Sequence, residues 1–129
     1  MLSISQAAKV TGLSVKSIRH YEQIGLISAP PRSSNEYRYY PESLIKQLHF
    51  IKSTKDAGFN LKESKALLNL SEDNERSSAD VKEIALQKIE ELEARIKQQQ
   101  TLLASLKKIT KQCHGDKTAS CPIIDAFVR

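Results

Sequence analysis

The chain has 129 residues, a formal charge of +5 and a pI of about 9.2. Its apolar runs are only a few residues long, so we expect no transmembrane helix. The first residues lack the basic segment followed by an apolar segment that marks a signal peptide, so we expect none. We therefore expect a soluble, cytoplasmic protein that keeps its two cysteines as thiols. The length leaves little room for a large catalytic domain, so an enzyme is not expected.

The basic excess is concentrated near the start of the chain. Residues 1–58 hold eight Lys and Arg against four Asp and Glu, whereas residues 59–112 hold ten against nine and residues 113–129 two against two. A basic module favours a polyanionic partner, although an ordinary solvated surface explains the charge equally well. Charge alone therefore leaves both interpretations open.

Two short helices joined by a tight turn are predicted first. Ser5 is expected to cap a helix over residues 6–10, and Ser14 to cap a second helix over residues 15–24 that ends at Gly25. Two short helices around a three-residue glycine turn are typical of a helix-turn-helix.

A small β wing and a third helix are predicted next. Residues 26–27 and 37–40 are expected to form two short strands connected by a polar turn. Pro41 suits the first turn of a helix over residues 42–57, which Gly58 ends.

A fourth helix and one long helix complete the body of the chain. Asn60 and Glu63 form a capping pair for a helix that ends near Leu70, and Ser78 is expected to cap a helix over residues 79–110. Alternating four- and three-residue spacing marks a seam along it: Ala85, Ile89, Leu92, Ile96, Gln99, Leu103, Leu106 and Thr110. A helix roughly 48 Å long cannot bury this seam alone, so we expect a dimer rather than a monomer.

Two thiols follow the long helix. Cys113 and Cys121 are separated by seven residues that include Gly115, so the loop can bring both sulfurs together. Thiolates select Cu(I), Zn or iron–sulfur clusters, but zinc and clusters usually take four ligands. Two thiols and at most one imidazole, His114, therefore favour a two-coordinate monovalent ion. Thiol redox chemistry and two uninvolved thiols stay open as alternatives.

Four motifs lie within the first 61 residues: Ile4-Ser5-x-Ala7-Ala8-x-x-Thr11-Gly12-Leu13-Ser14, Ile18-Arg19-His20-Tyr21-Glu22-x-x-Gly25-Leu26-Ile27, Arg32-x-x-Asn35-x-Tyr37-Arg38-x-Tyr40 and Gly58-Phe59-x-Leu61. With them, the chain resembles the MerR family of transcription regulators. The resemblance implies a homodimer with winged-helix heads and an antiparallel coiled coil between the long helices. It also implies binding to an inverted repeat in promoter DNA, which metal binding distorts so that RNA polymerase can use both promoter elements.

DNA contacts are expected from the second helix, which enters the major groove in a helix-turn-helix, and from the wing. Helix position and the resemblance together give nine expected contacts: Lys16, Ser17, Arg19, His20, Tyr21, Arg32, Tyr37, Arg38 and Tyr40. For Tyr21 and Tyr40 the alternative is that the rings simply pack between helix and wing.

The spacing Cys113-x7-Cys121 with the following Pro122-Ile123-Ile124 resembles the CueR-like subgroup of the family, which senses Cu(I), Ag(I) and Au(I). The resemblance implies one ion per protomer, bound linearly by Cys113 and Cys121, and the activation of copper export or detoxification genes. Pro122 is expected to open a short helix through residue 127 that packs over the site.

Selectivity is expected to depend on residues around the thiols. The family's divalent-metal sensors carry a cysteine at the start of the long helix, where this chain has Ser78, which counts against Hg(II), Zn(II), Cd(II) and Pb(II). Two thiolates and a monovalent ion leave a net charge of −1, for which Lys82 and Lys117 are candidate compensating cations. His114 is either an added ligand or a solvated loop residue.

The sequence therefore predicts a mainly α fold: a winged-helix DNA-binding domain with a second helical pair over residues 1–70, a hinge loop and dimerisation helix over 71–112, and a metal-binding loop with a short helix over 113–129. Two other functions stay open. One is recognition of a cationic drug, and the other is thiol redox catalysis, although the cysteines lack the Cys-x-x-Cys spacing.

Overall fold

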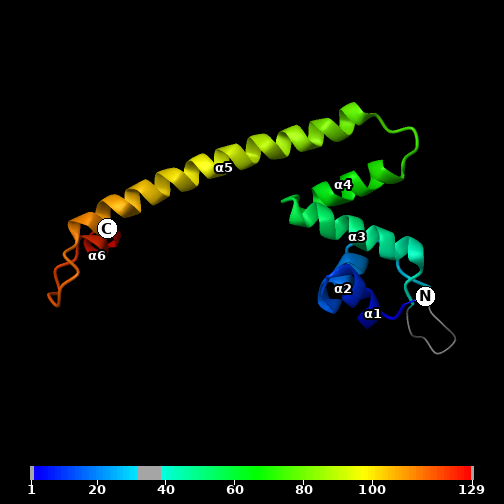
Figure 1. The fold of residues 1–129 in the computed structure, drawn as a ribbon, viewed down its shortest axis with the longest axis horizontal. Helices are drawn as coiled ribbons and strands as arrows, with labels where there is room; N and C mark the ends of the chain where they lie inside the picture. Colours follow the sequence, from blue (N-terminus) through cyan, green and yellow to red (C-terminus); the bar gives the residue numbers. More distant parts are fainter. Residues whose placement is uncertain (1, 32–38, 129) are drawn as a thin grey trace. The chain divides into compact units, whose positions relative to one another are not determined.

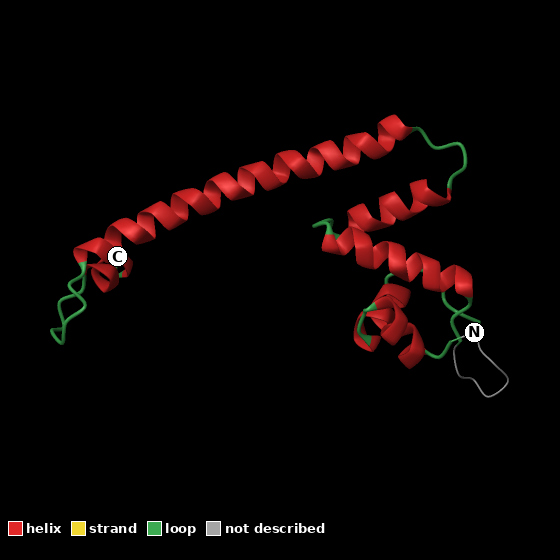
Figure 2. Ribbon diagram, in the orientation of Figure 1, coloured by secondary structure: helices red, strands yellow, loops and turns green. Residues whose placement is uncertain are grey.

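The computed structural model describes residues 2–31 and 39–128, and its regular structure there is helical (Figures 1 and 2). The helices are α1 (Ile4–Thr11), α2 (Val15–Gln23), α3 (Glu42–Asp56), α4 (Leu61–Glu72), α5 (Ser78–Gln112) and α6 (Pro122–Phe127). Within these residues the β structure is limited to one isolated antiparallel bridge between Leu2 and Tyr40. The predicted mainly α fold is confirmed.

The chain divides into two compact units, Met1–Ala85 and Leu86–Arg129. This division falls inside α5, whereas the sequence predicts boundaries after residues 70 and 112, near the ends of α4 and α5. None of the helices in the described part of the chain combines the length and apolar character that a membrane span requires.

The start of α1 differs from its prediction. Ser3, not Ser5, caps the helix, because Gln6 stands three residues after Ser3 and completes a reciprocal capping box. The Ser3 Oγ accepts the Gln6 N–H at 3.2 Å, and the Gln6 Oε1 accepts the Ser3 N–H at 2.9 Å. The predicted caps at Ser14 and Asn60 are confirmed.

The start of α5 is also set by a neighbouring serine. The Ser77 Oγ accepts the N–H of Ala79 at 3.1 Å, and Ser78 is the first residue of the helix rather than its cap. From there α5 runs for 35 residues, which corresponds to roughly 52 Å.

The strand expected at residues 26–27 does not form. The amides of Leu26 and Ile27 both donate to the carbonyl of Tyr21, at 2.9 and 3.4 Å, so the chain bends back on the end of α2. Tyr40 pairs instead with Leu2, through hydrogen bonds of 3.1 and 2.6 Å. The backbone N–H groups that a β wing would have used at residues 26–27 are therefore satisfied locally.

One hydrophobic core holds the first unit together, with α1 packed against α2 and α3, and α3 against α4. Its buried residues are Ala7, Ile18, Tyr21, Leu26, Ile27, Tyr40, Leu44, Leu48, Ile51 and Leu68. A buried polar pair also joins α3 to α4, because the hydroxyls of Thr54 and Ser64 share a hydrogen bond of 2.7 Å. This packing fixes α2, the helix that carries most of the expected DNA contacts.

Candidate metal centre and nucleic-acid interface

The two cysteines face each other across a loop. Cys113 directly follows α5 and Cys121 directly precedes α6, and their Sγ atoms lie 3.8 Å apart. Both are free and half-buried, and the separation is far longer than the roughly 2.0 Å of a disulfide. The loop brings the sulfurs together as the spacing predicts, whereas metal binding by them stays a prediction.

The loop between the thiols is folded by its own groups. Gly115 has φ +67°, in the left-handed region that favours glycine. The carboxylate of Asp116 accepts both the hydroxyl and the N–H of Thr118, at 2.5 and 2.9 Å. The Thr118 hydroxyl, and then its N–H, lower the pKa of Asp116 because they stabilise the carboxylate. Asp116 is thus engaged in shaping the loop.

The pKa of the Cys121 thiol is also lowered. The main cause is the backbone N–H of Ile124 in the first turn of α6, which stabilises the thiolate, and Cys113 and the N–H of Ile123 act in the same direction. Desolvation and the negative charge of Asp125 oppose this shift. The start of α6 therefore favours the form of Cys121 that binds metals.

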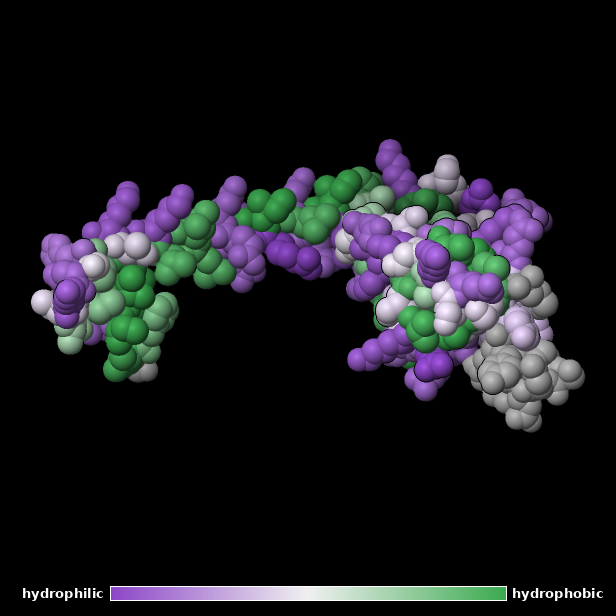
Figure 3. All heavy atoms as spheres, turned by 60° about the horizontal axis from the view of Figure 1, so that its bottom comes forward, coloured by the Kyte–Doolittle hydropathy of each residue, from purple (hydrophilic) through white to green (hydrophobic). Residues whose placement is uncertain are grey.

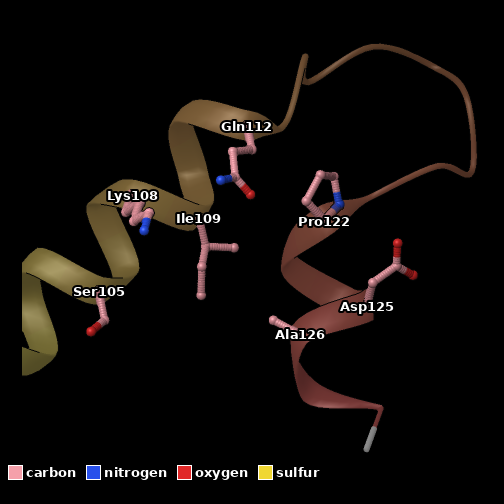
Figure 4. Close-up of a pocket in the computed structure, with 7 residues that line it drawn as sticks. All are labelled: Ser105, Lys108, Ile109, Gln112, Pro122, Asp125 and Ala126. Atoms are coloured by element: carbon pink, nitrogen blue, oxygen red, sulfur yellow. The ribbon is translucent and has the colours of Figure 1, made fainter.

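An open hollow of about 550 Å³ lies between the last turns of α5 and the short helix α6, next to the thiols in the sequence. In Figure 4, Ile109 and Gln112 extend from α5 toward α6. Its lining residues are Ser105, Lys108, Ile109, Gln112, Pro122, Asp125 and Ala126. Gln112 and Pro122 adjoin Cys113 and Cys121 in the sequence, whereas neither cysteine lines the hollow.

The donor set around the sulfurs is small. Across residues 2–31 and 39–128, no group of three or more His, Cys, Asp or Glu side chains is arranged to hold a metal ion. His114 is exposed. Ser78 and Lys82 are exposed in the first turns of α5 and belong to the first compact unit, whereas the thiols belong to the second. The roles expected for Ser78 and Lys82 in metal selectivity therefore stay predictions.

The expected DNA contacts on α2 form an accessible basic surface. Lys16, Arg19 and His20 are exposed, and Ser17 is half-buried. The Ser14 hydroxyl bonds to that of Ser17 at 2.9 Å, which orients Ser17 at the start of the helix. Arg32, Tyr37 and Arg38 lie outside the described residues.

Tyr21 and Tyr40, the other two expected DNA contacts, lie in the core. Tyr21 is 6% exposed and Tyr40 is 1% exposed. The Tyr40 hydroxyl donates to the carboxylate of Glu22, a partner that the sequence analysis did not identify because 18 residues separate the two. Burial thus favours packing over a DNA contact for both rings.

Family models match two overlapping parts of the chain. A model described as "MerR HTH family regulatory protein" matches residues 2–71, and one described as "MerR, DNA binding" matches residues 45–109. The chain belongs to the MerR family. As a MerR-family protein it is a DNA-binding transcription regulator and not an enzyme, and the fold described above is the one that carries this function.

Several relatives of this MerR-family chain are similar over most of their length. It is 43% identical to the HTH-type transcriptional regulator CueR of Escherichia coli O6:H1, over 96% of this chain and 92% of that protein. It is also 43% identical to the heavy metal-dependent transcription regulator 2 of Rhizobium meliloti, over 96% and 84% of the two chains. The crystal structure of PbrR691 from Ralstonia metallidurans in complex with lead(II) has a TM-score of 0.86 and 26% identity, and covers 99% of this chain and 100% of that one.

Proposed function

We propose that this protein is a copper-responsive transcription activator that binds one Cu(I), or Ag(I) or Au(I), per protomer between Cys113 and Cys121. The observation that carries the proposal is the pair of free sulfurs at 3.8 Å. The CueR relative and the heavy metal-dependent relative support a metal response. A reducing cytoplasm suits this site, because it keeps both thiols available.

The number of donors favours a monovalent ion. Zinc sites in proteins generally have four ligands, or three and an open position, whereas soft Cu(I) is satisfied by thiolates alone. The described residues offer two thiols without a third His, Cys, Asp or Glu ligand beside them. By the family resemblance, divalent-metal sensors donate a cysteine where Ser78 stands here, which further favours a two-coordinate ion over the lead(II) bound by PbrR691.

The position of the thiols would couple ion binding to α6. A soft monovalent ion would be held by the thiolates of Cys113 and Cys121, whose Sγ atoms lie 3.8 Å apart. Because Cys121 is the residue before α6, binding at its sulfur would act on the first turn of that helix.

A second copy of the chain is proposed to complete the structure. Ile89, Ile96, Leu103 and Leu106, which we call the α5 stripe, are each about half exposed, at 49, 56, 52 and 48%. Figure 3 shows apolar side chains gathered along this helix. All four lie at positions of the predicted heptad seam, so a partner helix is the occupant that their spacing fits. We therefore propose a homodimer with a coiled coil between the two α5 helices.

Activation then requires the metal to favour one arrangement of the dimer. We propose that the heads bind two halves of an inverted repeat through Lys16, Ser17, Arg19 and His20 of each α2, with Arg32, Tyr37 and Arg38 as further contacts. Metal binding shifts the dimer toward the arrangement that distorts the promoter, because the two arrangements differ in affinity for the ion. A distortion costing a few kcal/mol lets RNA polymerase read the promoter, and copper export or detoxification genes are the proposed targets.

Anaerobic titration with Cu(I) and with Zn(II) tests the site. We expect one Cu(I) per protomer with two sulfur neighbours in X-ray absorption spectra, and transcription from a copper-export promoter that rises with Cu(I). Cys113→Ser and Cys121→Ser should each abolish this response while leaving DNA binding intact. The exposed Ser120→Ala is the matched control within the same loop.

Two results would contradict the proposal. Tight zinc binding without a transcription response to Cu(I) would remove the copper assignment. A full Cu(I) response in either cysteine variant would remove the two-thiol site itself.

A further inference from the structure

The C-terminal end of α2 is connected to α4 through the bend that follows it. The Tyr21 carbonyl in its last turns accepts the amides of Leu26 and Ile27, as described above, so the bend after α2 is tied to the helix. The carbonyl of Leu26 then accepts a hydrogen bond of 3.2 Å from the Nζ of Lys65 on α4. A continuous set of hydrogen bonds therefore runs from α4, through the bend, to α2.

The hydrogen bond from Lys65 can hold the bend after α2 in position, a role distinct from that of a solvated surface lysine. Lys65 is half-buried, and Leu26, whose carbonyl it contacts, is 3% exposed. Hydrogen bonds from charged donors are stronger than those between neutral groups. A cation also interacts favourably with the partial negative charge at the C-terminal end of a helix. The ammonium group thus holds the bend in one place relative to α4.

We propose that Lys65 is a positioning residue that sets the orientation of α2 for sequence-specific DNA binding, rather than a residue that contacts DNA. This inference rests on the proposed use of α2 in DNA recognition. Since base contacts depend on the position of α2 more than phosphate contacts do, loss of the Lys65 bond reduces specific binding more than non-specific binding.

Lys62→Met is a matched control for Lys65→Met. Lys62 is exposed one turn earlier on α4, so its replacement removes the same charge from the same helix without removing the bond to Leu26. Lys65→Arg retains a cationic donor and should restore binding. Far-UV circular dichroism and thermal unfolding of all three variants identify any general loss of structure.

The DNA measurement uses a duplex selected from a random-sequence pool by the wild-type protein, with poly(dA-dT) as the non-specific duplex. For Lys65→Met we expect the ratio of specific to non-specific affinity to fall by up to roughly tenfold, the limit reached if the free energy of this charge-assisted hydrogen bond is lost from the specific complex alone, with an unchanged salt slope. Lys62→Met should keep the wild-type ratio, and Lys65→Arg should regain most of it.

Each alternative result has a defined meaning. A salt slope reduced by about one unit in Lys65→Met would make Lys65 a phosphate contact and overturn the inference. An unchanged affinity ratio would also overturn it. If the wild-type protein selects no sequence at all, the proposed DNA recognition by α2 fails instead.

Hydrogen exchange gives a readout that is independent of DNA. The amides of Leu26 and Ile27 should exchange faster in Lys65→Met than in wild type, because the bend loses its tie to α4. Lys62→Met should leave both rates unchanged. Equal exchange of these amides in Lys65→Met and wild type would show that the bond does not hold the bend.

Discussion

Replacing Leu103 with alanine tests whether a second copy of the chain covers the α5 stripe. Leu103 is 52% exposed in the single chain. Full burial of a leucine side chain contributes about 1.5–3 kcal/mol, so covering the exposed half contributes about 1 kcal/mol. In a symmetric dimer each substitution occurs twice, which gives a loss of about 2 kcal/mol and a roughly 30-fold rise in the dimer dissociation constant.

Sedimentation equilibrium measures this change directly. Gln98→Ala is the matched control, because position 98 lies on the same exposed helix, outside the predicted seam, and alanine favours helix at both positions. Circular dichroism should therefore show unchanged helicity in both variants. If Leu103→Ala and Gln98→Ala had the same dissociation constant as wild type, a partner helix would not cover the stripe.

Three further predictions concern stability and the thiols. Ser64→Ala should lower the free energy of unfolding by about 1–3 kcal/mol, which urea denaturation can measure. Its combination with Thr54→Val should cost less than the sum of the two single changes, and strictly additive losses would show that the hydroxyls do not act as a pair. Gly12→Ala should cost about 1–2 kcal/mol because Gly12 has φ +77°, and an unchanged urea midpoint would rule out this strain. The lowered pKa of Cys121 favours its thiolate in the folded protein, so this contribution to stability is complete above the ordinary thiol pKa and is lost as the pH falls through the lowered value. Alkylation of Cys121 in Cys113→Ser should therefore reach half its plateau rate at a lower pH in folded than in urea-unfolded protein, and coincident midpoints would contradict the shift.

Local signals predicted the helices well, because caps and glycine stops act over a few residues. The predicted cap at Ser5 is wrong because Gln6, three residues after Ser3, completes a capping box with Ser3, and this signal is present in the sequence. The apolar pair Leu26 and Ile27 has strand propensity, but both amides donate hydrogen bonds to the carbonyl of Tyr21 in α2. Propensity alone does not reveal such competition between local partners.

The candidate site was likewise predicted from the sequence only in part. Seven intervening residues with a glycine were enough to predict that Cys113 and Cys121 meet. The contacts of Tyr40 with Glu22 and of Lys65 with the bend after α2 join residues 18 and 39 positions apart. No periodicity or motif encodes a pairing at that distance, so these contacts become visible only when the helices are packed.

The hydroxyl pair between α3 and α4 has a consequence for how this protein changes shape. Sliding one helix past the other by a turn would separate the buried hydroxyls of Thr54 and Ser64 and leave that of Ser64 without this partner, at a cost of about 1–3 kcal/mol. The Gln47 amide reinforces the same register by donating to the Glu72 carboxylate at 2.8 Å. The two contacts therefore resist sliding of α3 along α4 and keep the helices in one register. The hinge expected in the loop after α4 stays a prediction, and α3 and α4 would turn about it together.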